Sequence, residues 1–178
     1  TEFRRDVADR LSGWPIAFAN DANCFAVAEA AMGAGRGYGL VFGVIMGTGV
    51  GGGLVVEGEV REGLHSIAGE WGHMVLRPES DRRCYCGQCG CVETYLAGPW
   101  VERHYCELAG RMRTLAEILK RRSAGDSSAR TCIDVWLDHY GRAMANLINI
   151  LDPDIVVLGG GVSNADCLYD EGRQHVAR

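Results

Sequence analysis

One histidine and four cysteines lie within nineteen residues of the sequence, between His73 and Cys91. Structural zinc sites use four nitrogen or thiolate ligands in a tetrahedron, and these ligands often come in closely spaced pairs. The spacing H-x10-C-x-C-x4-C supplies one such set, consisting of His73, Cys84, Cys86 and Cys91. Gly87 and Gly90 fall inside this segment and let the backbone turn tightly around a metal ion. The segment therefore predicts a structural zinc site.

The spacing leaves two alternatives open. Cys89 could replace Cys91 as the fourth ligand, or the cysteines could form disulfides or be unrelated buried thiols. The remaining cysteines are scattered through apolar segments, at Cys24, Cys106, Cys132 and Cys167. Together with the lack of a recognisable signal peptide, this scatter favours thiolate ligation in a reducing compartment over disulfides. We therefore expect a cytoplasmic protein.

Composition limits the remaining possibilities. A chain of 178 residues with 47% hydrophobic content can bury a core and corresponds to about one domain. The net charge of −5 and the isoelectric point near 5.5 argue against a nucleic-acid partner, which usually requires a basic surface. The longest apolar run, at 40–46, is far too short to cross a bilayer. We therefore expect neither nucleic acid nor a membrane as a partner.

Two glycine-rich stretches could form backbone-built sites. The sequence GTGVGGG at 47–53 can present several backbone N–H groups and the Thr48 hydroxyl to a phosphate. It lacks the lysine of a Walker motif and no helix follows it, so a tightly packed hairpin is the alternative. Three glycines at 159–161 follow a buried strand, where a ligand could approach the backbone closely, or where the chain simply turns into a helix. Two such turns favour a nucleotide.

The apolar pattern predicts an α/β fold in which strands lead into glycine-rich turns and helices lie behind them. We expect strands at 16–19, 40–46, 53–57 and 155–158, the middle two as a hairpin. We expect helices at 23–32, 99–108, 115–122 and 132–151. Asn23 or Asp21 could cap the first helix. Residues 58–91 show little regular period, and residues 123–128 read as a loop.

Three carboxylates lie close to these features. Asp21 follows a predicted strand, where active-site residues of open α/β sheets often lie, although its residue type alone favours helix capping. Glu70 precedes His73 by three residues, so both could face one site from a helical turn. Glu93 follows the last cysteine by two residues. Each could be a solvated surface acid, but glutamates on both sides of a metal loop would hold polar groups toward a small ligand.

Five motifs occur in the order seen in the ROK family (repressor, open reading frame, kinase), and the sequence resembles this family over nearly its whole length. They are NDAN at 20–23, GTGVGGG at 47–53, AGEWGH at 68–73, CYCGQCGCVE at 84–93 and LGGG at 158–161. The combination of AGExGH with CxCGxxGCxE is highly specific. Within the family, the sequence is most similar to bacterial N-acetylglucosamine kinases and fructokinases.

The resemblance implies an actin-like (ribonuclease H-like) ATPase fold with two lobes. It also implies ATP with magnesium, a homodimer, and phosphorylation of a sugar hydroxyl, usually the 6-OH, of N-acetylglucosamine, fructose or glucose. Phosphoryl transfer depends mainly on positioning and charge stabilisation, which backbone amides of glycine turns can supply. A single carboxylate can activate the attacking hydroxyl. The zinc ion would orient sugar-binding groups and would not act as a Lewis acid.

The resemblance also assigns roles to individual residues. Asp21 matches the general base. The residues that match sugar-binding positions are Asn20, Glu70, His73 and Glu93. The zinc ligands are matched by His73, Cys84, Cys86 and Cys91, which leaves Cys89 as a bystander. The phosphate-binding loop is matched by Gly47, Thr48, Gly49, Val50, Gly51, Gly52 and Gly53, and the turn near the adenosine by Gly159, Gly160 and Gly161. We therefore expect the glutamates to serve the sugar and the glycine turns to serve ATP.

The sequence departs from the family pattern at both ends. The family's opening Asp-x-Gly-(Gly/Thr)-Thr phosphate motif and its closing helix have no counterpart here. Residues 1–178 therefore resemble the central and larger C-terminal lobe, with the zinc loop 73–91 inserted and the N-terminal lobe missing, and we expect little turnover from this chain alone. A non-catalytic sugar-binding fragment and a sugar-responsive repressor are the alternatives. The lack of a basic DNA-binding segment and the presence of Asp21 favour the enzyme.

Overall fold

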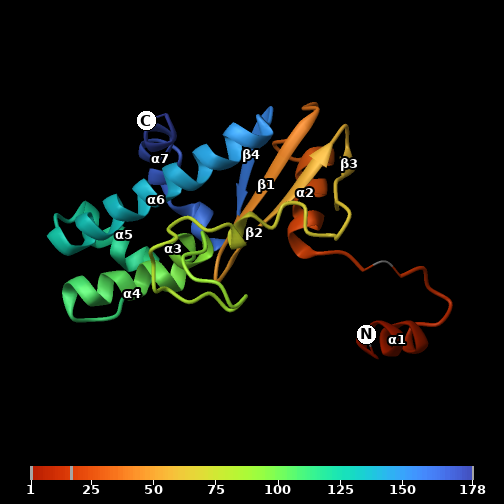
Figure 1. Ribbon diagram of the computed structural model, residues 1–178, viewed down its shortest axis with the longest axis horizontal. Coiled ribbons are helices and arrows are strands. Elements are labelled where there is room, and N and C mark those ends of the chain that lie inside the picture. Colours follow the sequence, from red (N-terminus) through yellow and green to blue (C-terminus); the bar gives the residue numbers. More distant parts are fainter. Residues whose placement is uncertain (1, 17, 178) are drawn as a thin grey trace.

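The computed structural model describes residues 2–16 and 18–177 and shows a mixed four-stranded sheet flanked by helices (Figure 1). The strands, in the order β3-β2-β1-β4 across the sheet, are β1 (Leu40–Met46), β2 (Val50–Val56), β3 (Glu59–Val60) and β4 (Ile155–Gly159). β1 and β2 form an antiparallel hairpin, and β4 runs parallel to β1. Because parallel strands end at the same edge of a sheet, the glycines that follow β1 and β4 lie side by side.

The sheet lies between α2 on one face and the helices that follow β3 in the chain on the other (Figure 1). The helices are α1 (Glu2–Arg10), α2 (Asp21–Met32), α3 (Glu93–Leu96), α4 (Gly98–Ala109), α5 (Leu115–Ser123), α6 (Ser127–Leu151) and α7 (Glu171–Val176). Side chains alternate along β1, so that Val41 packs with Ala26 of α2 and Phe42 joins the larger core formed with the other helices. α1 buries none of its residues. No helix in the described part of the chain is long and apolar enough to cross a membrane.

Periodicity located most of the long elements correctly. The strand at 40–46 is confirmed at both ends, and the strand at 155–158 and the helices at 99–108 and 115–122 each extend by only one or two residues. α6 begins at Ser127 rather than 132, because the Asp126 side chain accepts a hydrogen bond from the Ala129 N–H (3.0 Å) and caps the helix there. Part of the predicted loop at 123–128 is therefore helical. β2 begins at Val50 rather than Gly53, because Gly51 already pairs with Ile45.

The prediction around residue 20 was wrong in two respects. No strand forms at the described residues 16, 18 and 19, and residue 17 lies outside the described part of the chain. The cap of α2 is Asn20, not Asn23 or Asp21. The Asn20 Oδ1 atom accepts hydrogen bonds from the backbone N–H groups of Ala22 (2.8 Å) and Asn23 (3.2 Å). This leaves Asp21 as the first residue of the helix, without the capping role.

Two glycines let α2 lie directly against the hairpin. A Cβ atom at Gly53 would lie 2.6 Å from the Ala22 carbonyl oxygen, and one at Gly43 would lie 2.8 Å from the Ala26 Cβ. These two glycines face each other across β1 and β2. Their missing side chains allow the close approach that fixes the N-terminus of α2, and hence Asp21, at the turn end of the hairpin.

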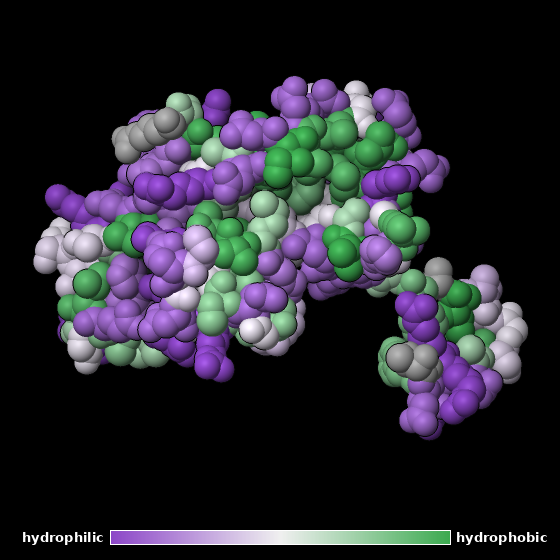
Figure 2. Space-filling model, in the orientation of Figure 1, coloured by the Kyte–Doolittle hydropathy of each residue, from purple (hydrophilic) through white to green (hydrophobic). Residues whose placement is uncertain are grey.

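A continuous apolar patch covers the surface above the sheet (Figure 2). A shallow hollow there, between the sheet and the C-terminal end of α6, is lined by exposed Ile67 and Ile150 together with Phe42, Trp71 and Leu147. Scattered exposed apolar residues are normal, but a contiguous patch of this kind is common where proteins associate. The homodimer that the sequence implies stays a prediction.

Candidate active site and metal centre

A cavity of about 350 Å³ opens at the turn end of the β1–β2 hairpin. Its walls come from the N-terminus of α2, the hairpin turn, the residue before the 3-10 helix Trp71–His73, the segment 84–86 and the start of α3. The lining residues are Asn20, Asp21, Ala22, Ile45, Gly47, Thr48, Gly49, Val50, Gly51, Glu70, Tyr85 and Glu93. A larger hollow of about 540 Å³, between α4 and residues 81–83, contains none of the predicted site residues. The smaller cavity is therefore the candidate active site.

This cavity brings together residues that the sequence places far apart. Asn20, Asp21, Glu70 and Glu93 all line it, together with residues 47–51 of the glycine-rich stretch. The remaining residues predicted to bind sugar or nucleotide lie outside the lining: His73, Gly52, Gly53, Gly159, Gly160 and Gly161. Gly52 packs against Trp71 and Phe42, so the last glycines of the stretch serve close packing of β2. Their predicted contact with phosphate is untested.

Asp21 reaches the cavity from the first turn of α2. Its Oδ1 atom accepts a hydrogen bond from the Ala22 N–H (2.9 Å), and the side chain is exposed. The N-terminus of a helix favours negative charge because the peptide dipoles point their positive ends there. With Asn20 serving as the cap, the Asp21 carboxylate is free to act on a molecule in the cavity.

The glycine turn, residues 47–49, forms another part of the cavity wall. The Gly47 N–H donates to the Gly49 carbonyl (2.9 Å), and the Gly98 N–H donates to the Gly47 carbonyl (2.9 Å). The N–H groups of Thr48 and Gly49 donate to no other residue in the described part of the chain. Successive unpaired N–H groups in a turn form a concave site for an anion. Gly160, with φ 80°, packs against Met46, which places the second glycine stretch beside this turn.

The predicted metal ligands lie within one small cluster, which we call the Cys–His loop (residues 73–91). The ligand atoms of His73, Cys84, Cys86 and Cys91 are all within 4.8 Å of one another. The His73 Nδ1 and Cys84 Sγ atoms are 3.5 Å apart, and the Sγ atoms of Cys86 and Cys91 are 3.7 Å apart. A tetrahedron with zinc–sulfur bonds of about 2.3 Å and zinc–nitrogen bonds of about 2.0 Å has edges of about 3.5 to 3.8 Å. These two separations match the edges of such a tetrahedron, and the donor types are those of a structural zinc site.

The Cys–His loop also separates the alternatives that the sequence left open. Cys89 is not part of the ligand cluster, and its backbone pairs with Arg83. All eight cysteines are free in the structure. Burial raises the pKa of the Cys91 thiol to about 12 and also raises that of Cys84, whereas the Gln88 N–H lowers the pKa of Cys86. Two buried thiols of high pKa would need a bound cation to become thiolates at neutral pH.

A match along the whole sequence identifies the family of this chain. The model of the ROK family matches residues 1–178. The chain belongs to the ROK family. N-acetyl-D-glucosamine kinase of Pectobacterium carotovorum is 38% identical over 177 residues, covering 93% of this chain and 57% of that protein. N-acetylgalactosamine kinase of Shewanella sp. (strain ANA-3) is 40% identical over 158 residues, covering 85% of this chain and 51% of that protein.

Solved structures of ROK proteins share the α/β fold with its mixed sheet. ROK hexokinase from Thermus thermophilus matches with a TM-score of 0.88 and 34% identity, over 99% of this chain and 63% of that one. A ROK glucokinase from Streptomyces griseus, solved with glucose and AMPPNP, matches with a TM-score of 0.85 and 29% identity, over 97% and 60%. A ROK transcriptional regulator matches with a TM-score of 0.81 and 26% identity. The fold alone therefore does not separate kinases from regulators.

The chain spans about half to three fifths of the length of these curated relatives: 57% of the N-acetyl-D-glucosamine kinase and 51% of the N-acetylgalactosamine kinase. The two curated relatives and the hexokinase and glucokinase structures named above are sugar kinases, and the sugar in their names differs. The substrate of the whole protein is therefore a proposal.

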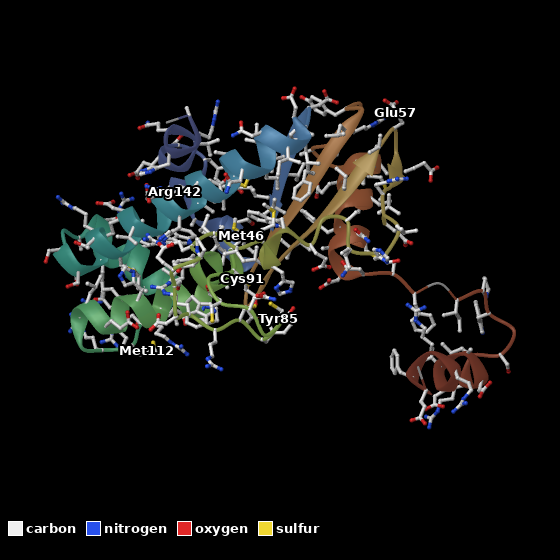
Figure 3. All side chains as sticks on the ribbon, viewed as in Figure 1. Met46, Glu57, Tyr85, Cys91, Met112 and Arg142 are labelled. Atoms are coloured by element: carbon white, nitrogen blue, oxygen red, sulfur yellow. The ribbon has the colours of Figure 1, made fainter. Side chains whose placement is uncertain are left out.

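One residue of this site in the ROK chain was missed by sequence reasoning. Tyr85 lies between two predicted zinc ligands, lines the cavity and is exposed (Figure 3). Its hydroxyl is 3.0 Å from His73 Nε2, and the two rings meet edge to face with centroids 5.1 Å apart. His73 thus directs Nδ1 to the cysteines and Nε2 to Tyr85. The position of Tyr85 between two predicted zinc ligands could have indicated its place in the site, because a residue between two ligands of one ion must lie close to that ion.

Proposed function

We propose that this chain supplies the sugar-binding cavity and one phosphate-binding turn of an ATP-dependent sugar kinase. The observation that carries the proposal is the convergence of Asp21, two glutamates and the glycine turn on one cavity. Its volume of about 350 Å³ is near the lower limit for small-molecule sites, which suits a monosaccharide. The kinase names of the relatives support the same activity.

In the proposed reaction, Asp21 accepts the proton of the attacking sugar hydroxyl as that oxygen bonds to the γ-phosphorus of ATP. The bond between the γ-phosphorus and the bridging oxygen breaks, and ADP leaves. Asn20, Glu70 and Glu93 hold the other sugar hydroxyls in position. The unpaired N–H groups of the glycine turn stabilise charge on the phosphate oxygens. Magnesium, brought with ATP, would neutralise part of that charge.

We also propose that zinc occupies the Cys–His loop as a structural ion. The ligand types and separations support this. The ion would fix His73 on one side and the start of α3 on the other, and so hold Tyr85, Glu70 and Glu93 toward the sugar. No step of phosphoryl transfer involves the metal in this proposal.

The substrate we propose is a hexose or N-acetylhexosamine phosphorylated at its 6-hydroxyl, with N-acetylglucosamine, fructose and glucose as the candidates. The names of the relatives favour an N-acetylhexosamine. We further propose that residues 1–178 form the larger lobe of the kinase, with the Cys–His loop inserted, and that they turn over little alone because the Asp-x-Gly phosphate motif is absent from them.

Calorimetric titration with a panel of hexoses, N-acetylhexosamines and ATP tests this function. We expect saturable binding of at least one sugar by the zinc-loaded chain and release of ADP when the other lobe is present. A sugar-responsive regulator, which the ROK regulator of the same fold keeps as the second candidate, would bind sugar without releasing ADP. A zinc-loaded, folded chain that binds no sugar would contradict both.

Glu70 offers a direct test of the sugar side. It precedes the 3-10 helix Trp71–His73 without capping it and lines the cavity, so its carboxylate can accept from a sugar hydroxyl. Loss of such a charge-assisted hydrogen bond costs about 1.5–3 kcal/mol. We expect Glu70→Ala to weaken hexose binding about ten- to a hundredfold, with little change for ATP. Titration of the variant beside Glu59→Ala, an exposed glutamate in β3, checks this. If the variant lost ATP binding but kept sugar binding, the assignment of this cavity to the sugar would be wrong.

A further inference from the structure

The two carboxylate oxygens of Glu93 contact two different parts of the site. Only 8% of this residue is exposed, and it follows the last cysteine of the Cys–His loop by two positions. Its Oε2 atom accepts a hydrogen bond from the Val50 N–H (3.0 Å), and its Oε1 atom lies 3.6 Å from the Cys84 Sγ atom. The Val50 N–H supplies a donor of the kind that a buried carboxylate requires, because desolvation of an unpaired charge is costly. Glu93 therefore contacts both the glycine turn and the metal ligands.

The contact with the turn is close and leaves no room for another side chain. Val50 directly follows the glycine turn, and a Cβ atom at Gly49 would lie 2.8 Å from Glu93 Oε2. At the start of α4, which follows α3 after one residue, the Gly98 N–H donates to the Gly47 carbonyl (2.9 Å). All four residues of α3 are buried. Glu93 at the start of α3 and Gly98 at the start of α4 therefore hold the glycine turn from two positions.

The Cys–His loop is in turn attached to the start of α3. Val75 pairs with Cys91, and the Val92 N–H donates to the Met74 carbonyl (2.9 Å). Arg82 lies over the Tyr95 ring and donates to the Thr94 carbonyl (3.0 Å). Movement of the loop would therefore shift the first turn of α3 and the carboxylate that it carries.

We propose that Glu93 is a positioning residue that couples the Cys–His loop to the phosphate-binding turn, so that metal in the loop sets the order of the turn and the affinity for ATP. The identity of the two ligands rests on the proposed function, but the coupling itself is a property of the fold. From the sequence alone, Glu93 serves only the sugar. In the structure, one of its oxygens is already committed to the turn.

Amide hydrogen exchange at the Val50 N–H measures this coupling in the absence of sugar and ATP. In the zinc-loaded chain this N–H is held by Glu93, and we expect chelation of zinc to speed its exchange by about tenfold or more. Glu93→Ala should show the fast exchange already with zinc bound, and chelation should add little. Glu93→Gln keeps an acceptor oxygen and should exchange nearly as slowly as the native chain. Measured zinc content shows that each variant remains loaded.

ATP affinity is the second measurement. We expect Glu93→Ala to weaken ATP binding about three- to tenfold, the effect of losing one hydrogen bond that orders the turn, while Glu59→Ala, at an exposed position in β3, leaves it unchanged. Zinc removal should weaken ATP binding in the native chain and hardly at all in Glu93→Ala, because the two changes break the same link. Equal effects of chelation in both proteins, or slow Val50 exchange in zinc-loaded Glu93→Ala, would overturn the coupling. Failure of the native chain to bind sugar would overturn the proposed function and leave the exchange result intact.

Discussion

Replacement of Asp21 by asparagine should lower the rate of phosphoryl transfer by about 10²-fold or more and leave sugar affinity nearly intact. Asparagine has almost the same shape and can still donate to or accept from a sugar, but it cannot take up the proton of the attacking hydroxyl. Asp21 is placed for this role because it lies in the first turn of α2 and lines the cavity. Measurement requires ADP release at saturating sugar and ATP in a protein that carries both lobes.

The competing explanation is that Asp21 only stabilises α2. Asn20 already caps the helix, so the loss of the Asp21 charge should cost no more than about 1 kcal/mol of folding stability. Urea unfolding of Asp21→Asn beside Asn20→Ala separates the two roles, since only the second variant removes the cap. Near-normal turnover combined with a large loss of stability in Asp21→Asn would show that the carboxylate serves the helix alone.

Local chemistry in the sequence was enough to predict most of the main elements and the Cys/His cluster. The apolar run at 40–46 and the helical period through Leu151 depend on burial of one face, which a sequence displays directly. The clustering of the four candidate zinc ligands could be predicted because three of them fall within eight residues of one another, at Cys84, Cys86 and Cys91. Ligands close in sequence leave few ways to arrange them around one ion.

What could not be predicted depends on contacts between distant segments. The Glu93 carboxylate meets Val50 across 43 positions of the sequence, and no local pattern reports that distance. Gly52 and Gly53 look the same in a sequence as the glycines of the turn, although they lie in β2 against other residues. The short helices α3 and α7 have too few residues to show a period. Asn20 and Asp21 are both good capping residues, so only the backbone conformation of residue 20 distinguished them.

The strongest effect on structure should come from the metal ligands. We expect one zinc per chain by elemental analysis, and Cys91→Ser should weaken zinc binding by more than the roughly 10- to 100-fold that loss of a ligand's hydrogen-bond partner typically costs. Cys91 is fully buried, and its backbone pairs with Val75, so loss of the metal should also loosen residues 70–93.

Cys89→Ser is the matched control, because it removes a thiol from the same loop without touching the ligand cluster. It should keep one zinc and the unfolding temperature of the native chain, whereas Cys91→Ser should lose both zinc and sugar binding. The reverse pattern would make Cys89 the fourth ligand. A native chain that folds fully without metal would remove zinc from the site altogether. Because the buried thiols must lose their protons to bind zinc, the affinity of the native chain should also rise with pH, and a pH titration of zinc uptake tests that dependence independently.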